Sequence, residues 1–126
     1  MRGIIIVSRF WTNFFSGRRA AAVTIFPFIF LLDRICLQDR ILLNHERIHM
    51  VQALELLVVP FYLWYVIEFL VRYFYYGNFR KAYLSISFER EAYTNETNMG
   101  YVKNRKIWSF VWYLWNDTNR NKEGAL

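Results

Sequence analysis

Hydrophobic residues gather in a few long runs separated by short polar stretches, and these runs predict helices. From Leu42 the apolar positions continue without glycine or proline up to Pro60, which predicts a buried helix over residues 42–59. Pro60 is expected to kink or restart this helix. A second helix then runs to about Tyr76 and ends at Gly77-Asn78, a pair that suits a C-terminal cap and turn. Helices joined so closely are expected to pack as neighbours.

Three other segments have recognisable patterns. Residues 20–32 are rich in β-branched and aromatic side chains around Pro27, so we predict an extended segment beside the first helix. Residues 88–96 combine helix-forming and charged side chains, which predicts a third, partly exposed helix. The apolar stretch 107–115 is expected to cover the core or touch lipid, and the polar residues 116–126 are expected to form a frayed tail.

Length and composition limit the architecture. With 126 residues and no linker-like stretch, the chain is expected to form one compact domain over residues 1–126. The fold class is predicted as mainly α, with a short extended segment before the 42–59 helix. The lone Cys36 cannot form an intrachain disulfide and is interpreted as a small buried apolar residue. The apolar run at residues 4–7 is interrupted by Ser8 and Arg9, so no signal peptide is predicted.

Charge and hydropathy together favour contact with a membrane. The chain is 56% hydrophobic and 21% aromatic and carries a formal charge of +6. Its basic residues are scattered and form no nucleic-acid module, so nucleic-acid binding is not expected. The longest uncharged apolar runs are residues 20–32 and 56–67, which are shorter than the roughly 18–20 residues that span a bilayer. Aromatic and basic side chains after Pro60 suit an interfacial position, so we expect a cytoplasmic protein or one peripheral or integral to the inner membrane.

The run His45-Glu46-Arg47-Ile48-His49 contains both histidines of the chain. In a helix, His45 and His49 lie on one face and can reach a single ion at roughly 2.0–2.1 Å. Glu46 is turned about 100° from His45, where a carboxylate can reach a metal-bound water. The pattern predicts a Zn²⁺ site with Glu46 as general base. In the alternative reading, the histidines are satisfied by hydrogen bonds and Glu46 pairs with an arginine.

A catalytic zinc site usually has three protein ligands, so a third must come from elsewhere in the chain. No further histidine exists, and a carboxylate is the best candidate. The downstream carboxylates are Glu55, Glu68, Glu89, Glu91 and Glu96. Gln52 follows one turn beyond the histidines on the same face, where it can contact substrate, orient a ligand or simply face a small cleft.

The two segments together resemble the gluzincin metallopeptidases, in which a glutamate from a later helix joins the two histidines. The second matching segment is Glu89-Arg90-Glu91-Ala92-Tyr93, which looks like the Glu-x-x-Ala-Asp helix of the membrane-associated CaaX-processing and heat-shock metallopeptidases. Tyr93 stands where those families have aspartate. The chain is more similar still to short bacterial proteins that join an HExxHxxQ helix to a Phe-Glu-x-Glu-Ala segment, over about residues 24–105.

The resemblance implies that Glu89 is the third ligand, and helix geometry agrees in part, because Glu89, Ala92 and Tyr93 share one face while Glu91 points largely away. The choice between Glu89 and Glu91 therefore favours Glu89. Tyr93 can donate to an oxyanion or act as a core tyrosine. The predicted function is a zinc-dependent metallopeptidase acting on a peptide or protein. The alternative is a non-catalytic, membrane-associated helical protein with a structural or vestigial metal site.

Overall fold

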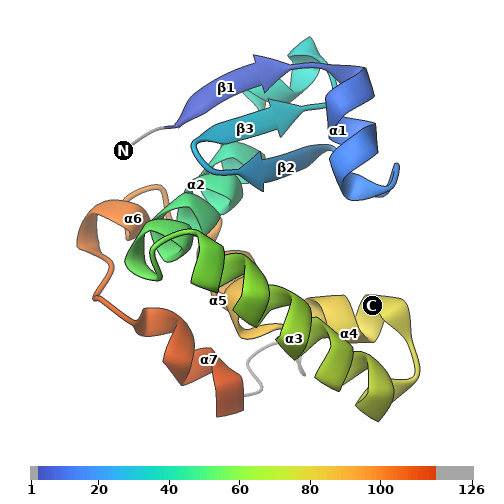
Figure 1. The fold of residues 1–126 in the computed structure, drawn as a ribbon. Coiled ribbons are helices and arrows are strands. Elements are labelled where there is room, and N and C mark those ends of the chain that lie inside the picture. The colour runs from blue at the N-terminus through green and yellow to red at the C-terminus, as the bar shows by residue number, and fades with distance from the viewer. Residues whose placement is uncertain (1–2, 116–126) are drawn as a thin grey trace.

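The computed structural model describes residues 3–115, in which a small sheet lies at one end of a group of helices (Figure 1). The prediction of a mainly α fold is confirmed. The N-terminal elements are β1 (Ile4–Val7), α1 (Arg9–Ser16), β2 (Ala22–Ile25), β3 (Phe28–Leu31) and the 3₁₀ turn η1 (Arg34–Gln38). The helices that follow are α2 (Arg40–Glu55), α3 (Val59–Tyr76), α4 (Phe79–Ser85), α5 (Ser87–Asn95), α6 (Tyr101–Asn104), η2 (Ser109–Val111) and α7 (Trp112–Trp115).

The sheet has the order β1-β3-β2, so β3 is central and β2 is an edge strand. β1 runs parallel to β3, with Ile5 opposite Ile29, and β2 runs antiparallel to β3, with Thr24 opposite Ile29. The chain between the two parallel strands passes through α1 and then β2. α1 is capped by the hydroxyl of Ser8 at its start and by Gly17 in the left-handed region at its end. One face of this sheet packs on α2, where Ile29, Leu31, Leu43 and Met50 form a buried cluster.

The N-terminal third is more structured than the sequence pattern predicted. The extended segment 20–32 is a hairpin of two strands, and Pro27 lies in the turn between them. β1 and α1 were not predicted, because residues 4–7 are too short a run to distinguish a strand from a loop. The helix that contains both histidines, α2, begins at Arg40, two residues before its predicted start.

The predicted helix over 42–59 ends earlier than expected, at Glu55. Leu57 and Val58 adopt positive φ angles, and α3 leaves at 112° to α2 with Pro60 in its first turn. Proline has no backbone N–H to lose at that position, so it starts α3 instead of kinking a continuous helix. The bend lets α3 cross the molecule and reach α4 and α5. α3 ends as predicted at Gly77, and Asn78 then caps α4.

The start of α5 is closed by a carboxylate from α3. Residues 86 and 87 supply no side-chain cap of their own. Glu68 instead accepts the backbone N–H of Ser87 at 2.6 Å and its hydroxyl at 2.7 Å. Trp64 and Arg72, one turn to either side on α3, donate to the same carboxylate. A buried anion at a helix N-terminus satisfies orphan N–H groups and interacts favourably with the helix dipole.

The helical part has its own core, and the C-terminal apolar stretch covers it as predicted. Phe88 and Phe110 are fully buried, and their rings lie 4.7 Å apart between centroids. The other buried members of this cluster are Ala53, Leu56, Phe61 and Ile86. The tail expected at residues 116–126 lies outside the described residues.

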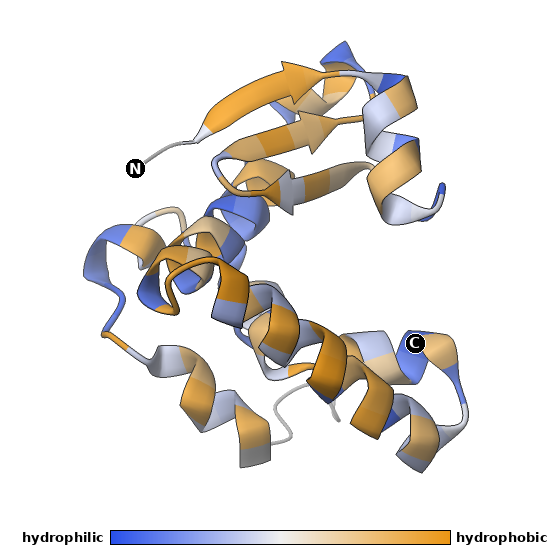
Figure 2. Ribbon diagram, in the orientation of Figure 1, coloured by the Kyte–Doolittle hydropathy of each residue, from blue (hydrophilic) through white to orange (hydrophobic). Residues whose placement is uncertain are grey.

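Within residues 3–115, no single helix has both the length and the apolar character needed to cross a bilayer. α2 and α3 meet the criterion only as a pair, with the sharp bend between them. Figure 2 shows that α3 is hydrophobic along almost its whole length, whereas α2 is mixed.

Replacing Glu68 by alanine should lower the free energy of unfolding by about 2 kcal/mol, because the buried N–H and hydroxyl of Ser87 at the start of α5 lose their acceptor. Chemical denaturation followed by circular dichroism measures the change. Glu68→Gln keeps the side-chain volume and one acceptor oxygen, so its loss should be smaller. Equal stability of the alanine variant and the wild type would show that Glu68 does not act as the cap.

Candidate metal centre

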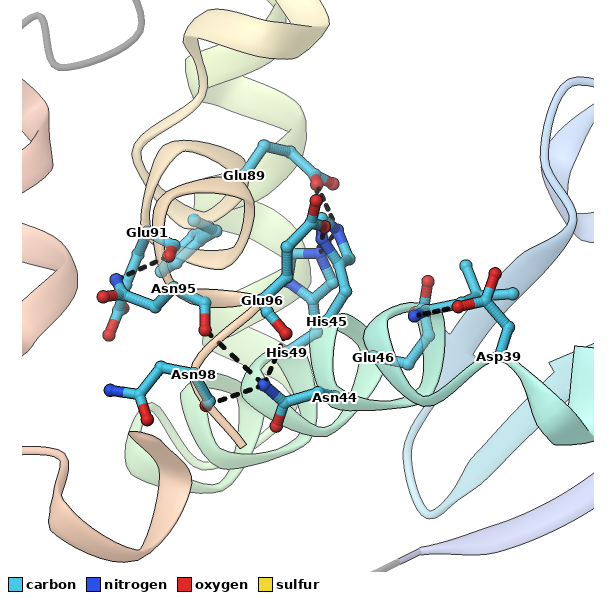
Figure 3. Close-up of polar contacts among 12 residues, drawn as sticks. Asp39, Asn44, His45, Glu46, His49, Glu89, Glu91, Asn95, Glu96 and Asn98 are labelled. Atoms are coloured by element: carbon cyan, nitrogen blue, oxygen red, sulfur yellow. Dashed lines mark hydrogen bonds and ion pairs between the residues drawn. The ribbon is translucent and has the colours of Figure 1, made fainter. Parts of the chain in front are cut away.

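The two histidines and Glu89 meet at one point between α2 and α5, with all three side chains directed at one another (Figure 3). Glu89 Oε1 lies 3.1 Å from His45 Nε2 and 3.1 Å from His49 Nε2. The two Nε2 atoms are 3.2 Å apart. The three residues are at most 6% exposed. They form a group of one ligand atom each that can hold a metal ion.

The triangle of donor atoms has nearly the size that a tetrahedral ion requires. Bonds of about 2.0–2.1 Å at tetrahedral angles place ligand atoms about 3.3–3.4 Å apart. The observed separations of 3.1–3.2 Å need only small outward shifts. Both imidazoles present Nε2, and Glu89 presents a single oxygen. The fourth tetrahedral direction remains for a further ligand.

Each imidazole is oriented by an acceptor at its other nitrogen. His45 Nδ1 lies 2.8 Å from the carboxylate of Glu96, and His49 Nδ1 lies 2.8 Å from Oε1 of Gln52. Both acceptors require an N–H at Nδ1, which leaves the neutral rings with their lone pairs at Nε2. Such acceptors fix the tautomer and orientation of histidines that ligate metals. The hydrogen bonds therefore prepare the two lone pairs for a cation.

Glu96 is held in place by a side chain next to the motif. Nδ2 of Asn44 donates to the backbone carbonyls of Glu96 at 2.8 Å and of Asn98 at 2.9 Å (Figure 3). Asn44 thus binds the C-terminal end of α5 to the turn of α2 that contains His45. Tyr93 stands where the families that the chain resembles have an aspartate, and Glu96, three residues later, is the acceptor at His45 Nδ1.

The electrostatics of the group favour positive charge at its centre. Burial alone would lower the pKa of His45, but hydrogen bonds to Glu89 and Glu96 outweigh it and raise that pKa to about 10. Burial likewise opposes a charge on His49, yet Glu89 raises its pKa. Burial would raise the pKa of Glu89, but the two imidazoles hold it far below its usual range, so Glu89 is ionised. Protons and a metal ion compete for this position, and metal affinity should therefore rise with pH.

The second oxygen of Glu89 is bound by α3. The hydroxyl of Tyr65 donates to Glu89 Oε2 at 2.6 Å, which leaves Oε1 facing the histidines. Burial and the adjacent carboxylate raise the pKa of Tyr65 well above its usual value, so it stays a donor at neutral pH. The motif gave no signal for Tyr65, because its contact depends on the bend between α2 and α3.

The prediction that Gln52 contacts substrate is not supported, because its side chain is fully buried behind His49. Its amide nitrogen donates to the carbonyl of Phe88 at 3.1 Å and to Glu91 Oε1 at 2.9 Å. These bonds turn the amide oxygen toward His49. The structure therefore corresponds to the ligand-orienting alternative for Gln52.

Glu91 points away from the donor triangle, as the helix geometry predicted, into a buried ionic cluster. Its carboxylate accepts from Arg105 Nε at 2.5 Å and from the hydroxyl of Tyr101 at 2.6 Å. Arg105 also donates to Glu55, at 2.9 Å. These contacts attach Tyr101 and Arg105, in the C-terminal part of the chain, to α2 and α5. Gln52 bonds both Glu91 and His49, so it connects this ionic cluster to the histidine.

A cavity of about 780 Å³ opens beside the donor triangle and is bordered by all three candidate ligands and by Glu46. Glu46 Oε2 lies 2.5 Å from the hydroxyl of Thr24 on the edge strand β2. Tyr93 also borders the cavity, where its ring meets the His45 ring edge-on at 4.4 Å between centroids and its hydroxyl bonds that of Tyr83. The predicted residues His45, Glu46, His49, Glu89 and Tyr93 are thus brought together.

Sequence reasoning missed three contacts around this site. Glu96 was considered only as a ligand, although its spacing of seven from Glu89 places both on one helical face. Thr24 and Tyr65 come from elements far from the motif in sequence, and no local pattern marks them.

Comparison of the chain with models of known protein families, with curated proteins and with solved structures finds no significant match. The resemblance to the gluzincins therefore stays a prediction from the two motifs.

Glu89→Gln should lower the affinity for a divalent transition metal by roughly a hundredfold or more, because a charged ligand becomes a neutral amide. Glu91→Gln is the matched control on the same helix. It should keep the metal and instead lower thermal stability, because it breaks the pairing of Arg105. Metal analysis after dialysis and competition with a chromogenic chelator measure both. If Glu91→Gln lost the metal and Glu89→Gln kept it, Glu91 and not Glu89 would be the third ligand.

Glu96→Ala should weaken metal binding about 10–100-fold, the typical effect of removing an orienting acceptor from a ligating histidine. Glu96→Gln keeps an acceptor oxygen near His45 Nδ1 and should retain most of the affinity. The same chelator competition distinguishes them. If Glu96→Ala and Glu96→Gln lower the metal affinity equally, the charge of Glu96 matters and its hydrogen bond does not.

Proposed function

We propose that the chain is a zinc-dependent peptidase with His45, His49 and Glu89 as the metal ligands. The supporting observation is the buried donor triangle at the wall of a cavity that also contains a carboxylate, Glu46. Two imidazoles and one carboxylate are a ligand set typical of catalytic zinc, in which the fourth position is left to water or substrate. Structural zinc sites usually have four protein ligands. The triangle and its cavity favour the catalytic alternative over a structural site.

His45, His49 and Glu89 would hold the zinc ion, which would act as a Lewis acid on a scissile carbonyl and lower the pKa of a water toward about 7. Glu46 acts as the general base: it accepts the proton of the attacking water and passes it to the leaving amine. Its position suits this role, because it follows His45 directly and borders the cavity without belonging to the donor triangle. Thr24 holds one oxygen of Glu46, so the other is left for the water.

Tyrosine hydroxyls at the cavity wall can stabilise the oxyanion that develops on the carbonyl. Burial raises the pKa of Tyr93 above its usual value, as it does for Tyr83, so both hydroxyls stay protonated at neutral pH. Tyr93 borders the cavity beside His45, and its hydroxyl is hydrogen-bonded to that of Tyr83. A tyrosine hydroxyl at this position can donate to an oxyanion. Tyr93 is therefore the proposed electrophilic residue.

Glu46→Gln should reduce peptide cleavage by a factor of 10³ or more and leave zinc bound, because the base is lost while the ligands remain. Cleavage of a mixed quenched-fluorescent peptide library, with and without chelator, measures the first effect, and metal analysis measures the second. Tyr93→Phe should keep zinc and retain more activity than the Glu46 variant. Stoichiometric zinc without chelator-sensitive cleavage would support a structural metal site instead.

A further inference from the structure

The outer face of α3 is apolar where a surface helix is normally polar. Six of its exposed positions follow the helical spacing of a single stripe: Leu63, Val66, Ile67, Leu70, Val71 and Phe74. These side chains are between 47% and 86% exposed. The two charged residues of α3, Glu68 and Arg72, lie on the opposite side, where Glu68 is bound to Ser87. The polarity of this helix is therefore inverted relative to one that faces water.

A second exposed apolar group lies on α1. Its members are Phe10, Trp11, Phe14 and Phe15, whose rings contact one another. The chain just after α1 meets the chain just after α3, because the guanidinium of Arg19 lies 4.0 Å over the ring of Phe79. The side chain of Arg19 thus connects the segments that follow the two exposed helices. Large exposed apolar patches of this kind mark sites that bind a partner or a membrane.

The exposed charges in the two sequence segments that contain these helices have one sign. Residues 1–32 contain no aspartate or glutamate, and residues 56–88 contain only Glu68, which is buried. Exposed cations accompany the apolar groups: Arg9, Arg18, Arg19, Arg80 and Lys81. Aromatic rings at the margins of the α3 stripe, such as Trp64 and Tyr75, have the amphipathic character found at the level of lipid headgroups. Apolar side chains bordered by cations and aromatic rings complement an anionic lipid surface.

We propose that α1 and the outer stripe of α3 dock on the surface of an anionic phospholipid bilayer. The aliphatic and phenylalanine side chains enter the boundary between headgroups and acyl chains, and the exposed arginines and Lys81 contact lipid phosphates. A second copy of the chain fits this face less well, because pairing would bring two basic borders together in a protein of charge +6. The inference stands apart from the peptidase proposal and needs no metal.

Sedimentation of the full chain with vesicles tests the proposal. The wild type should pellet with vesicles of phosphatidylcholine mixed with phosphatidylglycerol, and much less with phosphatidylcholine alone. Added salt should weaken the binding, since part of it is electrostatic. The double variant Ile67→Asp/Val71→Asp should bind at least roughly tenfold more weakly, because two aliphatic side chains leave the apolar layer.

The matched control is Ile35→Asp/Ile107→Asp, which changes two residues of similar exposure, 78% and 75%, outside α1 and α3. This control should bind vesicles like the wild type, and circular dichroism should show both double variants folded. Glu46→Gln should also bind like the wild type, which separates this test from that of the peptidase. Equal binding of Ile67→Asp/Val71→Asp and wild type would overturn the proposal. So would a wild-type dimer in sedimentation equilibrium that this variant dissociates.

Discussion

Three buried acceptor atoms within 3.2 Å of one another impose the main constraint on this protein. Glu89 Oε1 faces two imidazole nitrogens, and the opposite nitrogen of each ring already donates to another residue. Such a group is stable in a dry interior only when a positive charge lies at its centre, because lone pairs would otherwise oppose lone pairs. A metal ion removes this conflict with one charge centre, whereas protons require two adjacent imidazolium rings. The arrangement of α2 against α5 is consistent with the first solution.

The residues behind the triangle explain how so small a chain holds it. Glu96 and Gln52 each orient one histidine. The backbone carbonyl of Glu96 accepts from Asn44 on α2, and the amide nitrogen of Gln52 donates to Glu91 on α5. Behind Gln52, the side chain of Arg105 is 1% exposed between Glu91 and Glu55. The C-terminal chain thus contributes to the site without supplying a ligand.

Much of the site could be predicted from the sequence, because it rests on local geometry. The i, i+4 spacing of His45 and His49 places both on one face of a helix. Glu89 was indicated by the resemblance to the gluzincins, and the helical repeat agreed in part, because it turns Glu91 away from the face of Glu89. The architecture around them was less accessible. The backbone reversal at Leu57 and Val58 follows from no residue preference, since neither is glycine, and it decides that Tyr65 and Glu68 reach α5. β1 is four residues long and pairs with a strand more than twenty positions away, a contact that no short window can reveal.

Glu68 links the two surfaces that matter most in this fold. It lies on the side of α3 opposite the apolar stripe, and its carboxylate closes α5 two residues before Glu89. A rigid-body tilt of α3 would therefore pull on the first turn of α5 or break two buried hydrogen bonds. Tyr65, on the same helix, would move the other oxygen of Glu89 in the same displacement. The position of the Glu89 carboxylate therefore depends on the orientation of α3.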